Sequence, residues 1–224
     1  MSFHDRADAG KRLAEALAAY REQHPIVLAL PRGGVAVAAE VARSLDAPLD
    51  LVLVRKIGVP YQPELAMGAV VDGPNPLVVR NEEVIRLSGV SEADFAAVCD
   101  SELKEIQRRR ARYLGSRSHP DLSGRVAIVV DDGVATGATT RAALKAVRAQ
   151  KPKQVILAVP VAPTSTLAEL RGEVDDIVCL EDHEPFYAIG AYYSNFQQVS
   201  DEEVIDILAR FPVGPPTALK PSAG

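Results

Sequence analysis

Short apolar runs alternate with longer amphipathic stretches along most of the chain. The apolar runs predict buried β-strands at residues 26–30, 49–54, 125–130, 154–159 and 176–180. Apolar residues that recur every three or four positions predict helices at residues 8–23, 35–45, 81–87, 91–114, 138–150, 164–171 and 200–210. Because helices separate the strands, we expect βαβ crossovers and an α/β fold, in which a parallel five-stranded core sheet is flanked by helices.

Three segments depart from this alternation. Residues 57–75 are rich in glycine and proline and predict a loop or hairpin, with residues 65–71 as its ordered part. Residues 186–196, FYAIGAYYSNF, hold five of the eleven aromatic residues. Residues 212–224 are rich in proline and glycine, cannot bury much apolar surface and predict a flexible tail. The preceding residues, 1–211, are expected to form one domain.

Charge and hydropathy narrow the classes of function. The formal net charge of −5 provides no basic surface for a nucleic-acid backbone, so a nucleic-acid partner is disfavoured. No apolar run approaches the ~20 residues that span a bilayer, and the polar N-terminus lacks the apolar core of a secretory signal. We therefore expect a cytoplasmic protein without a membrane partner.

The stretch VAIVVDDGVATGATT, residues 126–140, combines the groups that a sugar phosphate requires. Its apolar part predicts a strand, and Asp131 and Asp132 are the first polar residues where that strand ends. The following glycines permit close approach of backbone N–H groups to a phosphate, and the helix N-terminus adds unpaired donors and partial positive charge. The hydroxyls of Thr136 and Thr139 are further donors.

The two aspartates require a different ligand group, because carboxylates repel a phosphate. Vicinal sugar hydroxyls donate hydrogen bonds to ionised carboxylates, so a phosphate and a diol at one edge indicate a ribose 5-phosphate. The alternative is structural: Asp132 or Thr136 caps the helix and Asp131 is merely solvated. The succession of strand, acid pair, glycine-containing loop and helix favours the ribose phosphate site over this alternative.

The same stretch resembles the signature with which type I phosphoribosyltransferases bind 5-phosphoribosyl-1-pyrophosphate (PRPP): an apolar strand, two acids, three variable residues and Thr-Gly-x-Thr. The resemblance implies that Asp131 and Asp132 bind the ribose hydroxyls. It places the 5-phosphate among the loop residues Gly133, Val134, Ala135, Thr136, Gly137, Ala138 and Thr139. It also implies a small hood over the core, which we expect at about residues 181–211, with the N-terminal helix as a second candidate part.

The family binds pyrophosphate with a loop after its first core strand, a place that Pro31-Arg32-Gly33-Gly34 occupies here. The resemblance implies that Arg32, Gly33 and Lys56 bind pyrophosphate, and Arg32 and Lys56 are the candidate catalytic residues. We expect Lys56 at the end of the second core strand, with Arg55 as its competitor. A tight strand-to-helix turn is the structural alternative for the tetrapeptide. The lid that closes over the substrate in the family corresponds to residues 57–74.

The acceptor is less well defined by the sequence. Family members that act on 6-oxopurines carry an acid at the position of Ala135, so this residue argues against a hypoxanthine or guanine acceptor. The aromatic segment resembles the hood of purine salvage members, in which an aromatic residue stacks on the base, and Phe186 or Tyr187 would then bind the acceptor. Packing within the hood or a homodimer interface explains the same aromatic residues. His183 is a further candidate in this region.

The resemblance implies a pentosyltransferase of nucleotide metabolism, which transfers the 5-phosphoribosyl group of PRPP to a small nitrogenous acceptor and releases pyrophosphate. Mg²⁺ is expected with PRPP, with no direct protein ligand and with Asp131 and Asp132 reaching it through water. The main alternative is a non-catalytic PRPP-sensing regulatory protein of the same fold. A weaker alternative is a hydrolase or phosphorylase of phosphorylated ribosides.

Overall fold

Five parallel strands form the central sheet of the computed structural model, which describes residues 2–73 and 75–211. The strand order is β2-β1-β6-β7-β8. The strands are β1 (Ile26–Ala29), β2 (Leu49–Leu51), β6 (Val126–Val130), β7 (Gln154–Pro163) and β8 (Asp176–His183). All four pairings are parallel. This confirms the predicted α/β fold with a five-stranded parallel sheet.

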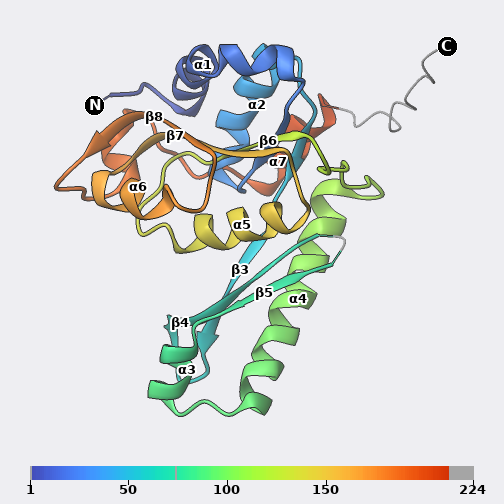
Figure 1. Cartoon of the computed structure of the whole chain (residues 1–224), viewed down its shortest axis with the longest axis vertical. Coiled ribbons are helices and arrows are strands. Elements are labelled where there is room, and N and C mark those ends of the chain that lie inside the picture. Colours follow the sequence, from blue (N-terminus) through green and yellow to red (C-terminus); the bar gives the residue numbers. More distant parts are fainter. Residues whose placement is uncertain (1, 74, 212–224) are drawn as a thin grey trace.

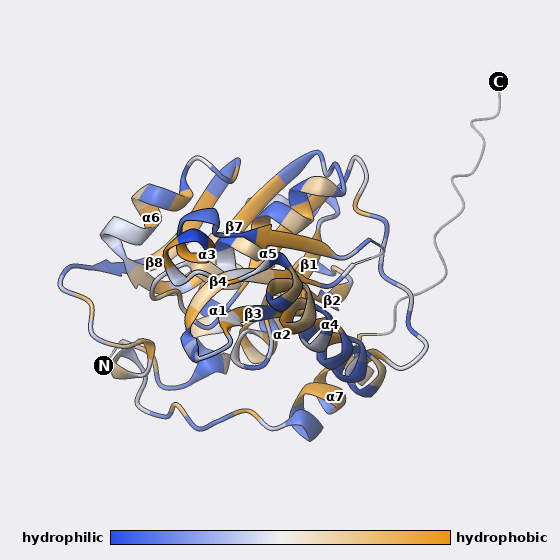
Figure 2. Cartoon of the chain, turned by 90° about the horizontal axis from the view of Figure 1, so that it is seen from below, coloured by the Kyte–Doolittle hydropathy of each residue, from blue (hydrophilic) through white to orange (hydrophobic). Residues whose placement is uncertain are grey.

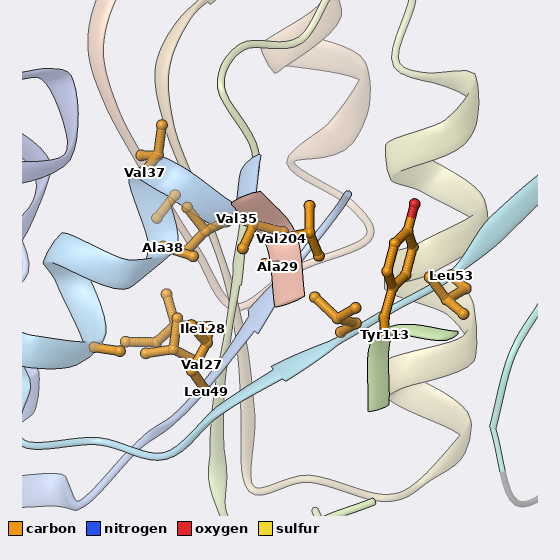
Figure 3. Close-up of a cluster of buried hydrophobic side chains, with 14 of the residues drawn as sticks. Val27, Ala29, Val35, Val37, Ala38, Leu49, Leu53, Tyr113, Ile128 and Val204 are labelled. Atoms are coloured by element: carbon orange, nitrogen blue, oxygen red, sulfur yellow. The ribbon is translucent and has the colours of Figure 1, made fainter. Parts of the chain in front are cut away.

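Helices cover both faces of this sheet. One face packs against α1 (Arg6–Ala16), α2 (Gly33–Leu45) and α7 (Asp201–Ala209), and the other packs against α5 (Ala138–Ala149) and α6 (Thr164–Leu170). Successive strand residues point to opposite faces, so Val27 and Ile26 of β1 belong to different hydrophobic clusters. Figure 3 shows Val27 of β1 and Ile128 of β6 together with Val204 of α7 on one face. Burial on both faces explains why β1, β6 and β7 are nearly continuous apolar runs, whereas β8 at the edge of the sheet also carries charged residues (Figure 2).

An arm projects from the central sheet (Figure 1). It consists of the antiparallel strands β3 (Val54–Val59), β4 (Gln62–Val71) and β5 (Leu77–Arg80), the helix α3 (Glu82–Ser88) and the long helix α4 (Glu92–Leu114). Ile57, Met67 and Ile106 are fully buried between the hairpin and α4, so the hydrophobic core continues into the arm. The prediction of a hairpin in residues 57–75 is confirmed, although its first strand begins before residue 57.

Several predicted element boundaries were wrong, including the ends of β7 and β8, which run past the predicted residues 159 and 180 to Pro163 and His183. The strand expected at residues 49–54 ends at Leu51, and Val54 already belongs to the arm, where it pairs with Val71 of β4. The helix expected at residues 8–23 ends at Ala16, and a 3-10 helix, η1 (Ala18–Gln23), follows it. The sequence does not show where β2 ends and β3 begins, because Leu51 and Val54 are both apolar. The break between these two strands depends on their pairing with strands that are distant in sequence.

The N-terminal segment joins the region expected to form the hood. The backbone N–H groups of Ser194 and Asn195 donate to the carbonyls of Phe3 and His4 at 2.9 and 2.8 Å. Phe3 and Tyr193 are both buried, with ring centroids 5.4 Å apart. The bounds proposed for the hood stay a prediction, and the predicted flexible tail, residues 212–224, lies outside the described residues. Within the described ranges, no helix combines the length and apolar character of a membrane span.

Candidate active site

The loops that follow β1 and β6 meet at the carboxyl edge of the sheet. The two strands are parallel neighbours, with Ala29 paired to Val130, so the residues after each strand emerge side by side. The loop after β1 contains a cis peptide between Pro31 and Arg32 and then packs on the acid pair. A Cβ at Gly33 would overlap the carboxylate of Asp132, and no larger residue fits there without displacing that group. The structure thus brings the predicted pyrophosphate loop into contact with the predicted ribose-binding acids.

Asp132 is held by two residues that the sequence did not suggest. Nε of Arg6, in the first turn of α1, donates to Oδ2 of Asp132 at 2.7 Å, and both side chains are about nine-tenths buried. The hydroxyl of Tyr193 donates to the backbone carbonyl of Asp132 at 2.6 Å. Arg6 is itself fixed by stacking over the ring of Phe196, 3.9 Å from its centroid, and by donation to the carbonyl of Gln197 at 2.7 Å. The N-terminal helix and the 193–197 segment therefore complete the site.

Asp131 lies in an environment that favours its protonated form. Desolvation raises the pKa of this carboxyl well above 3.8, and the neighbouring charge of Asp132 raises it further. Its Oδ1 accepts a hydrogen bond from the backbone N–H of Asp132 at 2.8 Å, and Arg6 partly offsets the shift. Because Asp132 is paired with Arg6, the acid pair repels a nearby phosphate less than two isolated carboxylates would.

The loop after the acid pair is held by hydrogen bonds on the side that faces β7 and α6 and is exposed on its other side. The backbone N–H of Val134 donates to the carbonyl of Val161 at 3.0 Å, and Oγ1 of Thr166 donates to the carbonyl of Ala135 at 2.8 Å. Thr136 and Thr139 are exposed on the open side. These contacts hold the loop against β7 and α6 while its hydroxyls remain available to a ligand.

The N-terminus of α5 lacks the side-chain cap that the structural alternative required. Its N-cap residue is Gly137 in the left-handed conformation, with φ of 73°, and no side chain accepts from the first turn. Neither Asp132 nor Thr136 therefore caps this helix. The first N–H groups of α5 are left with the donor capacity that suits an anion.

The two cationic candidates occupy different places. Arg32 stands directly before the glycine that contacts Asp132, and its Nη1 lies 3.5 Å from Oδ1 of Asp201. Lys56 lies within β3 of the arm instead of at the end of a core strand, and its Nζ lies 3.1 Å from Oε2 of Glu64. The expectation for its position was therefore wrong, since β2 ends five residues earlier at Leu51. Its role in pyrophosphate binding stays a prediction.

Lys56 also lines a cavity of about 360 Å³ between the hairpin and α4. Arg55, the competing candidate, donates to Glu102 of α4 at 2.6 Å on the same cavity. Both cations are therefore paired with carboxylates inside the arm.

Three aromatic rings form a stack beside the carboxyl end of β8. The ring centroids of His183 and Tyr192 are 4.5 Å apart, and those of Phe186 and Tyr192 are 5.1 Å apart, each with an interplanar angle of 22°. Phe186 thus already stacks on a protein ring, whereas Tyr187 is 84% exposed. The proposed contacts of Phe186 and Tyr187 with an acceptor stay predictions.

Comparison with known proteins assigns the family. The family model described as "Phosphoribosyl transferase domain" matches residues 2–194. Two curated proteins of Mycobacterium tuberculosis, from strains CDC 1551 / Oshkosh and ATCC 25618 / H37Rv, are named provisionally as phosphoribosyl transferases. Each is 48% identical to this chain over 208 residues, which cover 93% of the chain and 46% of the relative. The chain belongs to the phosphoribosyl transferase domain family, and it spans about half the length of these curated relatives.

A solved structure is also similar over nearly the whole chain. The crystal structure of the protein TT1426 from Thermus thermophilus is 42% identical to this chain, covers 94% of it and is itself covered to 99%, with a TM-score of 0.81. The central sheet, the arm and the loops at the carboxyl edge thus belong to an architecture that this protein shares with TT1426.

Proposed function

We propose that the protein transfers the 5-phosphoribosyl group of PRPP to a small nitrogenous acceptor, with release of pyrophosphate. The observation that carries the proposal is the contact between the acid pair after β6 and Gly33 and Gly34, which begin α2 directly after the turn that follows β1. In the proposal the two carboxyls bind the diol, the loop after them binds a phosphate, and the turn after β1 binds a second anion. Membership of the phosphoribosyl transferase domain family supports the same reaction.

Each part of PRPP then has a proposed partner. Asp131 and Asp132 accept hydrogen bonds from the ribose hydroxyls, while residues 133–139 and the N-terminus of α5 surround the 5-phosphate. Arg32 and Gly33 bind the pyrophosphate group, and Lys56 remains a candidate for the same group from the arm. The exposed hydroxyls of Thr136 and Thr139 agree with a phosphate that enters from solvent.

The proposed chemistry requires orientation more than covalent catalysis. The acceptor nitrogen attacks C1 of the ribose, the C1–N bond forms as the C1–O bond breaks, and pyrophosphate leaves with the electron pair of that bond. The proton that the acceptor nitrogen carries in excess is released afterwards. Positive charge on the ribose ring and negative charge on the leaving group develop together, so positioning and cations near pyrophosphate supply most of the rate enhancement.

Mg²⁺ fits this site as a partner of the ligand. Among residues 2–73 and 75–211, no group of three or more histidine, cysteine, aspartate or glutamate side chains is suited to hold a metal. The acid pair offers two carboxyls, one of which is already paired with Arg6. We therefore propose that phosphate oxygens supply most ligands of the ion, which neutralises charge on the leaving pyrophosphate, and that Asp131 and Asp132 contact it through water.

The acceptor contacts are proposed for the aromatic region at the end of β8. Tyr187 presents an exposed ring, and its neighbour in the sequence, Phe186, belongs to the stack with Tyr192 and His183. An exposed aromatic ring suits stacking on a planar heterocycle. Ala135 provides no carboxylate for acid–base work on a 6-oxopurine, so we propose an acceptor that does not need one.

The proposal is tested by measuring pyrophosphate release from PRPP and Mg²⁺ with a panel of nitrogen heterocycles and amines. We expect release that depends on one acceptor class, with formation of the matching 5-phosphoribosyl product. The control omits the acceptor. Release that is equally fast in the control indicates hydrolysis, and PRPP binding without release on any acceptor indicates a PRPP sensor; either result contradicts the transferase.

A further inference from the structure

The carboxylate of Asp201 is shared by three residues from two separate parts of the chain. Its Oδ1 accepts from the hydroxyl of Tyr113 at 2.5 Å and lies 3.5 Å from Nη1 of Arg32, and its Oδ2 lies 3.1 Å from Nη1 of Arg112. Arg32 belongs to the loop after β1, whereas Tyr113 and Arg112 belong to the last turns of α4. Nη2 of Arg112 also donates to Oε1 of Glu202 at 2.7 Å, so the cluster is an anion-binding arrangement whose present anions are carboxylates of the protein itself.

This cluster adjoins the proposed pyrophosphate site. Arg32 is followed by Gly33, which packs against Asp132, so the loop that carries one guanidinium of the cluster also contacts the acid pair. Helix α4 returns from the arm to the core at this point, and Figure 3 shows Tyr113 of α4 beside Leu53, next to the buried cluster of the central sheet. The return of α4 therefore brings Arg112 to the same cluster as Arg32.

Guanidinium groups bind carboxylates and phosphates with the same planar set of donors, and a diphosphate offers more charge and more oxygens than one carboxylate. We infer that Arg112 is a further pyrophosphate-binding residue and that the Asp201 carboxylate holds Arg32 and Arg112 until a diphosphate displaces it. This inference rests on the proposed function, because it assigns a further binding residue to the pyrophosphate half of PRPP.

The cluster is accessible to such a ligand. The side chains of Arg32, Asp201 and Arg112 are 35%, 22% and 41% exposed, so exchange of one anion for another requires no opening of the hydrophobic core. Hydrogen bonds from Tyr113 and the nearby guanidinium charges, led by Arg112, hold the pKa of Asp201 below its usual range. The carboxylate is therefore charged near neutral pH, as a competitor of pyrophosphate must be.

Helix α7 does not depend on Asp201 for its position. Val204 and Leu208 are buried against the core, and Ser200 and Glu203 form a complete capping box at the start of the helix. At the other end, Arg117 donates to the carbonyls of Leu208 and Phe211 at 2.9 and 2.7 Å. A purely anchoring role would thus duplicate contacts that α7 already has.

The test uses calorimetric titration of the full chain with magnesium pyrophosphate and, separately, with ribose 5-phosphate. The variants are Arg112→Ala, Asp201→Asn and Arg108→Ala. Arg108 is the matched control, because it lies on the same helix and its guanidinium, 58% exposed, pairs with Glu105. Thermal melting of each variant reports whether it remains folded.

We expect Arg112→Ala to weaken pyrophosphate binding by about tenfold, the loss of one hydrogen bond between charged groups, and to leave ribose 5-phosphate binding within about twofold. Asp201→Asn removes the competing charge that Arg32 and Arg112 share and leaves Glu202 on Arg112, so it should tighten pyrophosphate binding, whereas Arg108→Ala should change the binding of neither ligand. Equal effects of Arg112→Ala and Arg108→Ala on pyrophosphate, or weaker pyrophosphate binding by Asp201→Asn, would overturn the inference. Absence of ribose 5-phosphate binding in the wild-type chain would instead contradict the proposed function.

Discussion

Nε of Arg6 lies 2.7 Å from Oδ2 of Asp132, although the two residues are 126 positions apart in the sequence. The contact joins the N-terminal helix to the acid pair on which the proposed ribose site depends. It places a cation where two carboxyls would otherwise repel the phosphate groups of the same ligand. The proposed PRPP site is therefore built from both ends of the described chain, and the signature after β6 is only its central part.

Loss of this ion pair is expected to destabilise the protein. Arg6→Ala leaves the nearly buried Asp132 without its partner, and breaking a buried pair from one side costs about 3 kcal/mol. Urea unfolding measures the free energy of unfolding. The control is Arg43→Ala on α2, whose guanidinium is 54% exposed beside Glu40 and should contribute less than about 1 kcal/mol. Similar losses in the two variants would show that the Arg6–Asp132 pair has no special weight.

The raised pKa of Asp131 predicts a stability that depends on pH. In the unfolded chain the carboxyl titrates near 3.8, and in the folded chain desolvation and Asp132 raise its pKa. Between the two values the folded protein retains a proton that the unfolded chain has released, so the free energy of unfolding falls as pH rises through this window.

Asp131→Asn removes this titration while its side-chain oxygen can still accept from the N–H of Asp132. The variant should be more stable than the wild type at pH 7, and the difference should shrink as the pH is lowered toward 3.8. Urea unfolding at several pH values measures this. A difference that stays constant with pH would contradict the assigned environment of Asp131.

The close packing of Gly34 against the backbone at the end of β6 is tested by adding a methyl group to this glycine. A Cβ at Gly34 would lie 2.9 Å from both the Cα of Asp131 and the carbonyl oxygen of Val130, and backbone atoms cannot move aside as side chains do. Gly34→Ala should therefore reduce the free energy of unfolding by about 1–3 kcal/mol. At Gly172 a Cβ would meet nothing within 4 Å, so Gly172→Ala should stay within about 0.5 kcal/mol of the wild type. Equal effects would refute the contact between the loops.

The central sheet could be predicted from the sequence because its signal is local. The strands β1, β6 and β7 are buried, nearly continuous apolar runs, and helices of regular period separate the strands of the sheet. The acid pair and the loop after it follow from the same local order of residues. The start of α4 is local in the same way, because Oγ of Ser91 accepts from the N–H of Asp94 at 3.1 Å.

The place of the arm beside the core and the partners of Asp132 could not be predicted in this way, because they depend on contacts between distant residues. Gly58, Pro60 and Pro63 left a loop or a hairpin open, and Gly58 lies inside β3, where a Cβ would lie too close to the backbone of Pro63. Nothing in the sequence near Arg6 links it to residue 132. Lys56 was misplaced because the three-residue β2 and the start of β3 look like one continuous strand.

The central claim is that Asp131 and Asp132 bind the ribose of PRPP. The most direct test is calorimetric titration of magnesium PRPP into the wild-type chain and into Asp131→Ala/Asp132→Ala, with folding confirmed by circular dichroism. The control, Glu82→Ala/Glu83→Ala, removes two exposed acids from the first turn of α3 and so makes the same change in net charge. We predict that the wild type and the control bind PRPP and that the aspartate variant does not. Unchanged affinity in the folded aspartate variant would contradict the account.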